Sequence, residues 1–392
     1  MKSFFDKYLK PTKATIVCDW FEVSGECASM FLFKDQNEEY LRKEPLLINF
    51  TNDVSLSWII NKATSTYSKM FKINIGAIEF GVLFIEPRLT TIPTNRANIQ
   101  VNNEWLYTQD WHTNFEIVVS ALEIKLTNIS RIDIAIDGVN GILEFVSNYI
   151  KQYDHKKRVQ KVGQAKLHPF AFNDKQMIFE TINLGSRSSE KFCVMYHKSK
   201  ELNRHISKNY IKDFWVANGL GEKVVTDGIP KYIGLDHINR IEMRYKSGYM
   251  EHYPEFFNDM SVVQDSEKLA ALFFDSTERY FDFRLKTHFD IDKCKKLELI
   301  PKNIFTKAYL VKIQIPLRDN LFGIKQGLKA NTLFLLNGHA DEKREEVKEG
   351  IRLVIEKHKM QEWYAKRFPL WEKMVKVNNN TGHVYDIEYM LN

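Results

Sequence analysis

Apolar and polar residues alternate along much of the stretch from residue 14 to residue 246, as they do in half-buried β-strands. The alternation predicts strands at residues 14–23, 28–33 and 46–52, a hairpin over residues 67–85, and an edge strand over residues 99–106. Short connections between such strands favour antiparallel pairing. Helical spacing of apolar residues is found instead at residues 110–126 and 141–151.

The pattern changes in the second half of the chain. The polar segment after Glu201 is rich in glycine and is typical of a loop or insertion. Residues 266–285 and 339–368 have the period of long helices, and Pro369 is expected to end the second one. We therefore predict an α+β protein, with an antiparallel-sheet domain over residues 1–265 and a helical C-terminal region over residues 266–392.

Three of the sequence segments read as strands with polar side chains on one face, and we name them motifs 1, 2 and 3. They are residues 129–138 (ISRIDIAIDG), 179–201 (FETINLGSRSSEKFCVMYHKSKE) and 238–246 (INRIEMRYK). Because alternate residues of a strand share a face, Asp133 and Asp137 lie on the same side of motif 1. If the three strands are neighbours, their polar faces form one cleft.

Motif 2 has the residues expected of a phosphate-binding and phosphate-attacking segment. Its turn, residues 185–189, offers hydroxyl groups and one cation, Arg187, which suit a phosphate oxygen. Tyr196 suits attack on a phosphorus atom, but a free tyrosine has a pKa of about 10 and needs a cation or metal that favours the phenolate. Lys198 follows two residues later, on the same face of a regular strand. We predict that Tyr196 and Lys198 are catalytic.

The carboxylates of motifs 1 and 3 predict a site for a divalent cation. Asp133, Asp137 and Glu242 offer the hard oxygen ligands that magnesium or manganese prefers. On an ideal strand, Asp133 and Asp137 stand roughly 13 Å apart, too far to bind one ion directly. We expect one aspartate to bind the ion with Glu242 while the other pairs with an arginine or holds a water. The spacing leaves open which aspartate does which.

The distribution of positive charge predicts where DNA would bind. Lys and Arg number 56 against 50 Asp and Glu, a net charge of +6, which permits a nucleic-acid partner without requiring one. Residues 155–166, HKKRVQKVGQAK, contain no acidic residue and lead directly to motif 2. The predicted DNA-contacting residues are Arg131, Lys156, Lys157, Arg158, Ser186, Arg187, Ser188, Arg240 and Arg244.

The three motifs, in this order and at these separations, resemble the replication initiation factor family, the Rep trans type of rolling-circle plasmid initiator, and related relaxases of mobile elements. The resemblance implies site-specific nicking and joining of single-stranded DNA at a replication origin, with Mg²⁺ or Mn²⁺. Tyr196 matches the nucleophile, which becomes joined to the 5′ phosphate, and Asp133, Asp137 and Glu242 match the acidic positions. Family members commonly have an acidic residue or asparagine after the tyrosine, where this chain has His197.

Several alternative functions are consistent with the same residues. A conjugative relaxase or a phage initiator would share the chemistry, a non-catalytic DNA-binding regulator would keep the fold alone, and a metal phosphodiesterase would use water in place of Tyr196. The resemblance implies origin DNA as the partner, with a host helicase and polymerase as further candidates and a homodimer as one possible assembly. Each candidate also has an ordinary structural reading, since the chain has 17 tyrosines and exposed carboxylates are usually just solvated.

The remaining composition points to a cytoplasmic protein. The four cysteines show neither a CxxC pair nor zinc-ligand spacing, so we expect reduced thiols. No apolar run approaches the 18 residues or so that a membrane-spanning helix needs, and the first residues lack the apolar segment of a signal peptide. We therefore predict no membrane partner.

Overall fold

The structure is a computed structural model, and it describes residues 13–27, 46–49, 54–59, 62–109, 111–163, 165–173, 178–203, 208–226, 229–300, 305–306, 321–336 and 343–379. The chain divides into two compact units. Unit 1 comprises Met1–Lys34, Asn61–Met70 and Phe80–Ile313, and unit 2 comprises Asp35–Ile60, Phe71–Glu79 and Gln314–Asn392. Each unit is described by itself.

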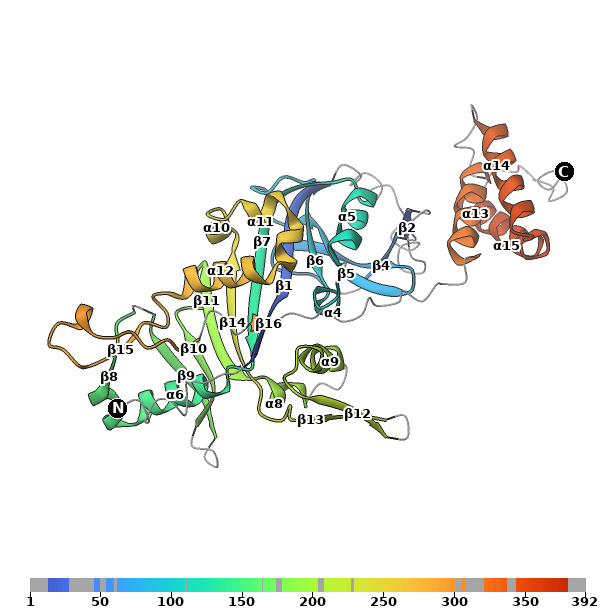
Figure 1. The fold of residues 1–392 in the computed structure, drawn as a ribbon. Coiled ribbons are helices and arrows are strands. Elements are labelled where there is room, and N and C mark those ends of the chain that lie inside the picture. Colours follow the sequence, from blue (N-terminus) through green and yellow to red (C-terminus); the bar gives the residue numbers. More distant parts are fainter. Residues whose placement is uncertain are drawn as a thin grey trace. The chain divides into compact units, whose positions relative to one another are not determined.

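Unit 1 is built on a long run of antiparallel strands (Figure 1). Their spatial order is β5 (Ile78–Pro87), β6 (Arg96–Val101), β1 (Ala14–Cys27), β7 (Ile124–Asp137), β14 (Asn239–Lys246), β11 (Lys191–His197), β10 (Ile178–Leu184) and β9 (Leu167–Asn173). Each neighbouring pair in this run is antiparallel. The short strand β16 (Phe305–Thr306) joins β1 in parallel. The α+β class predicted from the alternation is confirmed.

The apolar face of the central strands is buried. Ile134 and Ile136 of β7 lie opposite Met243 and Ile241 of β14, and all four side chains are excluded from solvent. Helix α6 (Asn140–Lys151) contacts β10 and β14, and α12 (Ser266–Thr277) contacts β1. Alternation in the sequence therefore decides which side of the sheet forms the core.

Shorter elements complete unit 1. The helices are α4 (Asn103–Leu106), α5 (Trp111–Ala121), α7 (Tyr153–Arg158), α8 (Lys198–Leu202), α9 (Asn209–Ala217), α10 (Ser247–Met250) and α11 (Glu255–Asn258), with 3₁₀ turns η3 (Met260–Gln264) and η4 (Ile291–Lys293). Two small antiparallel pairs stand apart from the long run of strands: β12 (Glu222–Thr226) with β13 (Ile229–Ile233), and β8 (Val159–Lys161) with β15 (Phe283–Leu285).

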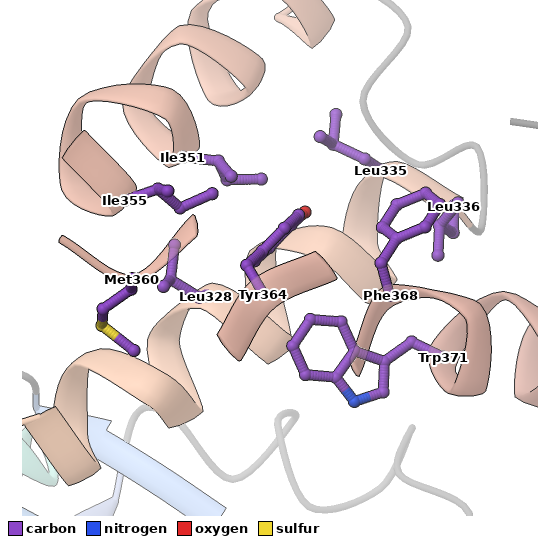
Figure 2. Close-up of a cluster of buried hydrophobic side chains, with 9 residues drawn as sticks. All are labelled: Leu328, Leu335, Leu336, Ile351, Ile355, Met360, Tyr364, Phe368 and Trp371. Carbon is purple, nitrogen blue, oxygen red and sulfur yellow. The ribbon is translucent and has the colours of Figure 1, made fainter. Parts of the chain in front are cut away.

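In its described part, unit 2 combines strands with three helices. Strand β3 (Val54–Trp58) pairs antiparallel with β2 (Leu46–Asn49) and with residues 71–75 of β4 (Tyr67–Ile75). Helices α13 (Leu321–Leu336), α14 (Arg344–Lys357) and α15 (Gln361–Asn379) pack around one apolar cluster (Figure 2). The cluster consists of Leu328, Leu335, Leu336, Ile351, Ile355, Met360, Tyr364, Phe368 and Trp371.

Several element predictions are confirmed and others are wrong. The strands of the three motifs and the helix after motif 1 are present, but residues 110–126 are helical only to Ala121, because β7 begins at Ile124. Residues 99–106 do not form an edge strand, since β6 pairs with both β5 and β1 and α4 follows it. The supposed loop after Glu201 contains α9 and the β12–β13 hairpin. The strand predicted at residues 28–33 lies outside the described residues.

The long helix predicted for residues 339–368 is two helices. Helix α14 ends at Lys357, and the chain reverses at Lys359, whose φ of 53° is left-handed. Pro369 lies inside α15 and does not end it. Phe368 and Trp371 on either side of the proline are both buried in the cluster of Figure 2, so packing outweighs the backbone hydrogen bond that the proline removes. The division at residue 265 stays a prediction; α12 and β15 beyond it belong to unit 1.

We expect Tyr364→Ala to destabilise the helices of unit 2 by about 3–5 kcal/mol, the usual cost of removing a buried aromatic ring. Tyr364 is fully buried and its hydroxyl shares a 2.7 Å hydrogen bond with Thr332. Hydrogen exchange of the α13–α15 amides measures the change. Leu353→Ala on α14 is the matched control, because that side chain is 52% exposed and its loss should change protection little. Equal effects of the two substitutions would contradict the assigned core.

Candidate active site

The polar faces of the three motifs lie on adjacent strands, with motif 3 in the middle. Strand β14 pairs with β7 on one side and β11 on the other. Arg240 is opposite both Asp137 and Tyr196, and Glu242 is opposite Ala135 and Val194. Directly paired residues of antiparallel strands point to the same face. Asp137, Arg240, Glu242 and Tyr196 therefore share one side of the sheet.

Tyr196 is oriented toward that shared face. It is the penultimate residue of β11 and its side chain is half-buried. Its hydroxyl donates a 3.0 Å hydrogen bond to Glu242 Oε2 and accepts one of 3.3 Å from Lys198 Nζ. The phenol oxygen thus lies between a carboxylate and an ammonium group.

Lys198 reaches Tyr196 by a different route from the one expected. The strand ends at His197, and Lys198 is the first residue of α8, for which the His197 side chain accepts a cap hydrogen bond from the Lys200 N–H. The Lys198 side chain is almost fully buried and makes a 2.7 Å ion pair with Glu201, one turn further along α8. Glu201 therefore fixes the ammonium group beside the phenol.

Burial determines the protonation states of Tyr196 and Glu242. It raises the pKa of Tyr196 well above its usual value, and the nearby Glu242 carboxylate adds to the effect. Burial also raises the pKa of Glu242 to about 7, helped by the negative charges of Asp133 and Asp19. Near neutral pH, Tyr196 is a protonated phenol, and the Glu242 beside it is close to its own midpoint.

Arg240 lies at the centre of a buried network beneath these groups. Its side chain has no solvent exposure, and its Nε and one terminal nitrogen each donate a 2.7 Å hydrogen bond to Asp137. It also makes a 2.8 Å ion pair with Asp19 and donates to the Tyr107 hydroxyl at 2.9 Å. Arg240 was predicted to contact DNA, but its guanidinium is enclosed and paired with carboxylates.

Asp137 and Asp19 are held in place by this network. Asp137 also accepts a 2.7 Å hydrogen bond from the Trp215 indole of α9 and is fully buried. Asp19 sits at a bulge in β1, where the register with β7 shifts between Cys18 and Trp20. The bulge turns this carboxylate toward Arg240, whose charge, with that of Lys198, lowers the pKa of Asp19 against the effect of its burial.

Asp133 is also neutralised by arginines. Arg131, two residues before it on the same strand, donates from two nitrogens to the two oxygens of Asp133, with Nε at 2.8 Å. Arg244 Nε lies 3.5 Å from Asp133 Oδ2. The Arg131 guanidinium stacks over the Trp20 ring at 4.2 Å, and both arginines keep part of their surface exposed. These two cations form the more accessible edge of the site.

The three predicted metal ligands are not assembled as a joint ligand set. Both oxygens of Asp137 bind Arg240, and both oxygens of Asp133 bind Arg131. No cluster of three or more His, Cys, Asp or Glu residues suited to a metal ion is found among the residues that the structure describes. Glu242 differs from the two aspartates because it accepts a hydrogen bond from a neutral group, the Tyr196 hydroxyl.

The other predicted DNA contacts lie on two exposed segments of unit 1. Lys156, Lys157 and Arg158 are on α7, which leads into β8 and its small pair with β15. Ser186, Arg187 and Ser188 form an exposed turn after Gly185, whose φ of 83° is left-handed. The Ser186 and Ser188 hydroxyls bond to each other at 2.7 Å, which orders the turn.

Four residues of the site were missed by the sequence analysis: Asp19, Tyr107, Glu201 and Trp215. Asp19 carries a signal that could have been used, since it is a single carboxylate within the apolar segment ATIVCDWF. Glu201 follows Lys198 at the i,i+3 spacing of an ion pair on a helix. Tyr107 and Trp215 have no local signal, because their partners are distant in the sequence.

Two general expectations can also be compared with the structure. All four cysteines are buried, and no disulfide bond joins any two of them. Among the described residues, none of the helices has the length and apolar character required to span a bilayer.

Comparisons with known proteins give one match to a family model, over part of the chain. No curated protein matches the chain. A solved structure of a rolling circle replication initiator protein from Geobacillus stearothermophilus is 12% identical, covers 73% of this chain and 93% of its own, and aligns with a TM-score of 0.39. A family model described as replication initiation factor matches residues 127–216, which include Asp133, Asp137, Tyr196 and Lys198. Over that segment, which holds motifs 1 and 2, this chain is similar to the replication initiation factor family, as its motifs had indicated.

Proposed function

We propose that the protein initiates rolling-circle replication by nicking and rejoining one DNA strand at an origin through Tyr196. The observation that carries the proposal is the position of the Tyr196 hydroxyl, bonded to Glu242 and Lys198 on the strands of motifs 2 and 3. The match of residues 127–216 to the replication initiation factor family supports the same reaction. Cytoplasmic location, a host helicase and polymerase as partners, and a homodimer belong to this proposal.

In the proposed reaction, the Tyr196 oxygen attacks the scissile phosphorus and the bond from phosphorus to the 3′ oxygen breaks. The 5′ phosphate becomes joined to Tyr196, and the other strand end leaves through its 3′ oxygen, which takes a proton from water to become a 3′ hydroxyl. Glu242 is placed to accept the phenol proton, since it already accepts that hydrogen bond at 3.0 Å. Lys198 stabilises the negative charge that develops on the phenol oxygen. Rejoining is the reverse transfer to a 3′ hydroxyl.

A divalent cation, Mg²⁺ or Mn²⁺, would polarise the scissile phosphate when bound. Glu242 is the residue that we propose as its main protein ligand, because Mg²⁺ commonly takes one or two carboxylates and fills its other positions with water and phosphate oxygens. Asp133 is the second candidate, provided that its pairing with Arg131 and Arg244 loosens. We propose that Asp137 is the aspartate that pairs with an arginine, Arg240, and does not bind the ion.

The remaining predicted DNA-binding residues divide into one that supports the site and several that would contact DNA. Arg240 is proposed as a positioning residue, because it is enclosed beneath Tyr196 and paired with Asp137 and Asp19. Arg131 and Arg244 keep exposed surface at the edge of the site and are proposed to contact the phosphates beside the scissile bond. Ser186, Arg187, Ser188, Lys156, Lys157 and Arg158 would contact the strand further away.

We expect Tyr196→Phe to abolish the covalent adduct with origin-containing single-stranded DNA, because it removes the attacking oxygen. The measurement is denaturing gel electrophoresis of labelled DNA after incubation with Mg²⁺ or Mn²⁺. Tyr210→Phe, another tyrosine of unit 1, is the control and should still form the adduct. An adduct with Tyr196→Phe would rule out this nucleophile. DNA binding without an adduct in the parent protein would point to a regulator instead.

Substitutions of Asp137 and Glu242 should have different effects, the first on stability and the second on cleavage. Asp137→Ala leaves the buried Arg240 without its main partner, and we expect a loss of about 3–5 kcal/mol in the free energy of unfolding. Glu242→Gln keeps the shape of a half-buried side chain, so the protein should stay folded and bind DNA but lose cleavage. Thermal unfolding and adduct formation, measured on both variants, test this. Full cleavage by Glu242→Gln would contradict both roles proposed for Glu242.

The pKa of Glu242 provides a test of cation binding that does not depend on activity. Without a divalent ion this carboxyl should titrate near pH 7, and bound Mg²⁺ should lower the pKa because a cation favours the carboxylate. Carbon-13 NMR of glutamate-labelled protein measures the titration, with Glu242→Gln identifying the signal. A midpoint that saturating Mg²⁺ leaves unchanged would show that Glu242 does not bind the ion.

A further inference from the structure

A cavity of about 320 Å³ opens on the surface of unit 1 beside the turn of motif 2. Its lining comes from β9, β10 and the turn that follows β10, and consists of His168, Phe170, Asn183, Gly185 and Arg187. The volume lies at the lower end of the range, about 300–1,000 Å³, that is usual for small-ligand pockets. Of these five residues, Arg187 alone was predicted to contact DNA.

Strand register places the cavity on the same face of the sheet as Tyr196. Thr181 of β10 is opposite Phe170 on one side and Tyr196 on the other. Asn183 is likewise opposite His168 and Val194, and Val194 is opposite Glu242. Neighbouring strands lie about 4.8 Å apart and β10 alone lies between the strands of Phe170 and Tyr196, so two strand spacings separate these residues by about 10 Å. This separation is of the size of one or two nucleotides of an extended strand.

Asn183 supplies an observation that points to a ligand. Its side chain is 3% exposed, and its Oδ1 is buried without a hydrogen-bond partner. Buried polar atoms of folded proteins are nearly always hydrogen-bonded, since leaving one unpaired costs free energy. Asn183 is one of the residues that line the cavity, so a donor group that reaches its Oδ1 from there would satisfy it.

The rest of the lining suits a nucleotide. Phe170 is 51% exposed, although phenylalanine side chains are usually buried. Much of its ring is therefore available for stacking. Arg187 and His168 are also exposed and line the same cavity, and Arg187 is the fixed cation of the hydroxyl-rich turn. An aromatic ring, an unpaired amide oxygen and a guanidinium group together match a base and its phosphate.

We propose that this cavity binds one unpaired nucleobase of single-stranded DNA, close to the phosphodiester that Tyr196 attacks. Phe170 stacks on the base, Asn183 Oδ1 accepts a hydrogen bond from an N–H of the base edge, and Arg187 contacts its phosphate. The inference rests on the proposed function and deepens it, because it names the residues that hold the strand in register with the nucleophile. It also gives a reason why the exposed phenyl ring lies on this face.

The test uses the full chain with the Tyr196→Phe substitution, so that the DNA is bound but not cleaved. Two fluorescent probes are compared by anisotropy at fixed salt: a mixed-sequence single-stranded oligonucleotide and an abasic oligonucleotide of the same length. Phe170→Ala should weaken binding of the first probe about 5- to 100-fold, the usual effect of losing one stacked base, and leave the abasic probe unchanged. Phe170→Trp should keep the affinity of the parent.

Two further variants separate stacking on the base from contact with the phosphates. Phe289→Ala removes a fully exposed phenyl ring elsewhere in unit 1 and should change neither affinity. Arg187→Ala should weaken binding of both probes by a similar factor, because both carry phosphates.

Three outcomes would overturn the inference. If Phe170→Ala binds the mixed-sequence probe like its parent, the cavity does not hold a base, and the proposed nicking activity is unaffected. If Phe170→Ala weakens both probes equally, Phe170 supports the fold or the backbone contacts and does not stack. If the parent binds neither probe, and the protein with Tyr196 intact forms no adduct, the proposed function fails together with the subsite.

Discussion

The buried ion pair between Arg240 and Asp137 is the constraint on which the site depends. A guanidinium group with no solvent exposure is tolerable only when carboxylates neutralise it, as Asp137 and Asp19 do here, while Asp137 and the Tyr107 hydroxyl accept hydrogen bonds from it. These partners come from β7, β1 and the segment after α4, so the pair joins motif 3 to three other parts of unit 1. Tyr196 is directly opposite Arg240 on the neighbouring strand, so its place in the sheet is tied to a network that cannot shift without leaving a buried charge unpaired.

The sequence alone predicted the strands of the site better than their chemistry. Alternation placed Asp133, Asp137, Glu242 and Tyr196 on one face correctly, because side-chain direction in a strand depends only on parity. Parity carries no information on burial or on partners, so it could not show that Arg240 is enclosed. The bulge at Asp19 and the Trp215 contact depend on residues far away along the chain, and no local pattern reveals them.

The helical predictions failed where packing overrode local signals. A proline was expected to end the helix at residue 369, yet buried aromatic residues on both sides keep α15 continuous. Conversely, the segment after Glu201 looked like a loop because of its glycines, but it contains α9, whose Ile211, Phe214 and Trp215 are buried. In both cases the deciding contacts were tertiary.

The β12–β13 hairpin has a consequence for how such a protein can diversify. Nearly all of its residues are exposed, and at its base Lys223 and Tyr232 bond to Asp213 of α9. It lies in the chain between β11, which carries Tyr196, and the central strand β14, yet its two strands pair with each other and stand apart from the register between β11 and β14. Evolution could lengthen, shorten or exchange this ribbon while the rows of polar side chains on the sheet stay in place, so lineages could acquire new surface contacts without rebuilding the polar site.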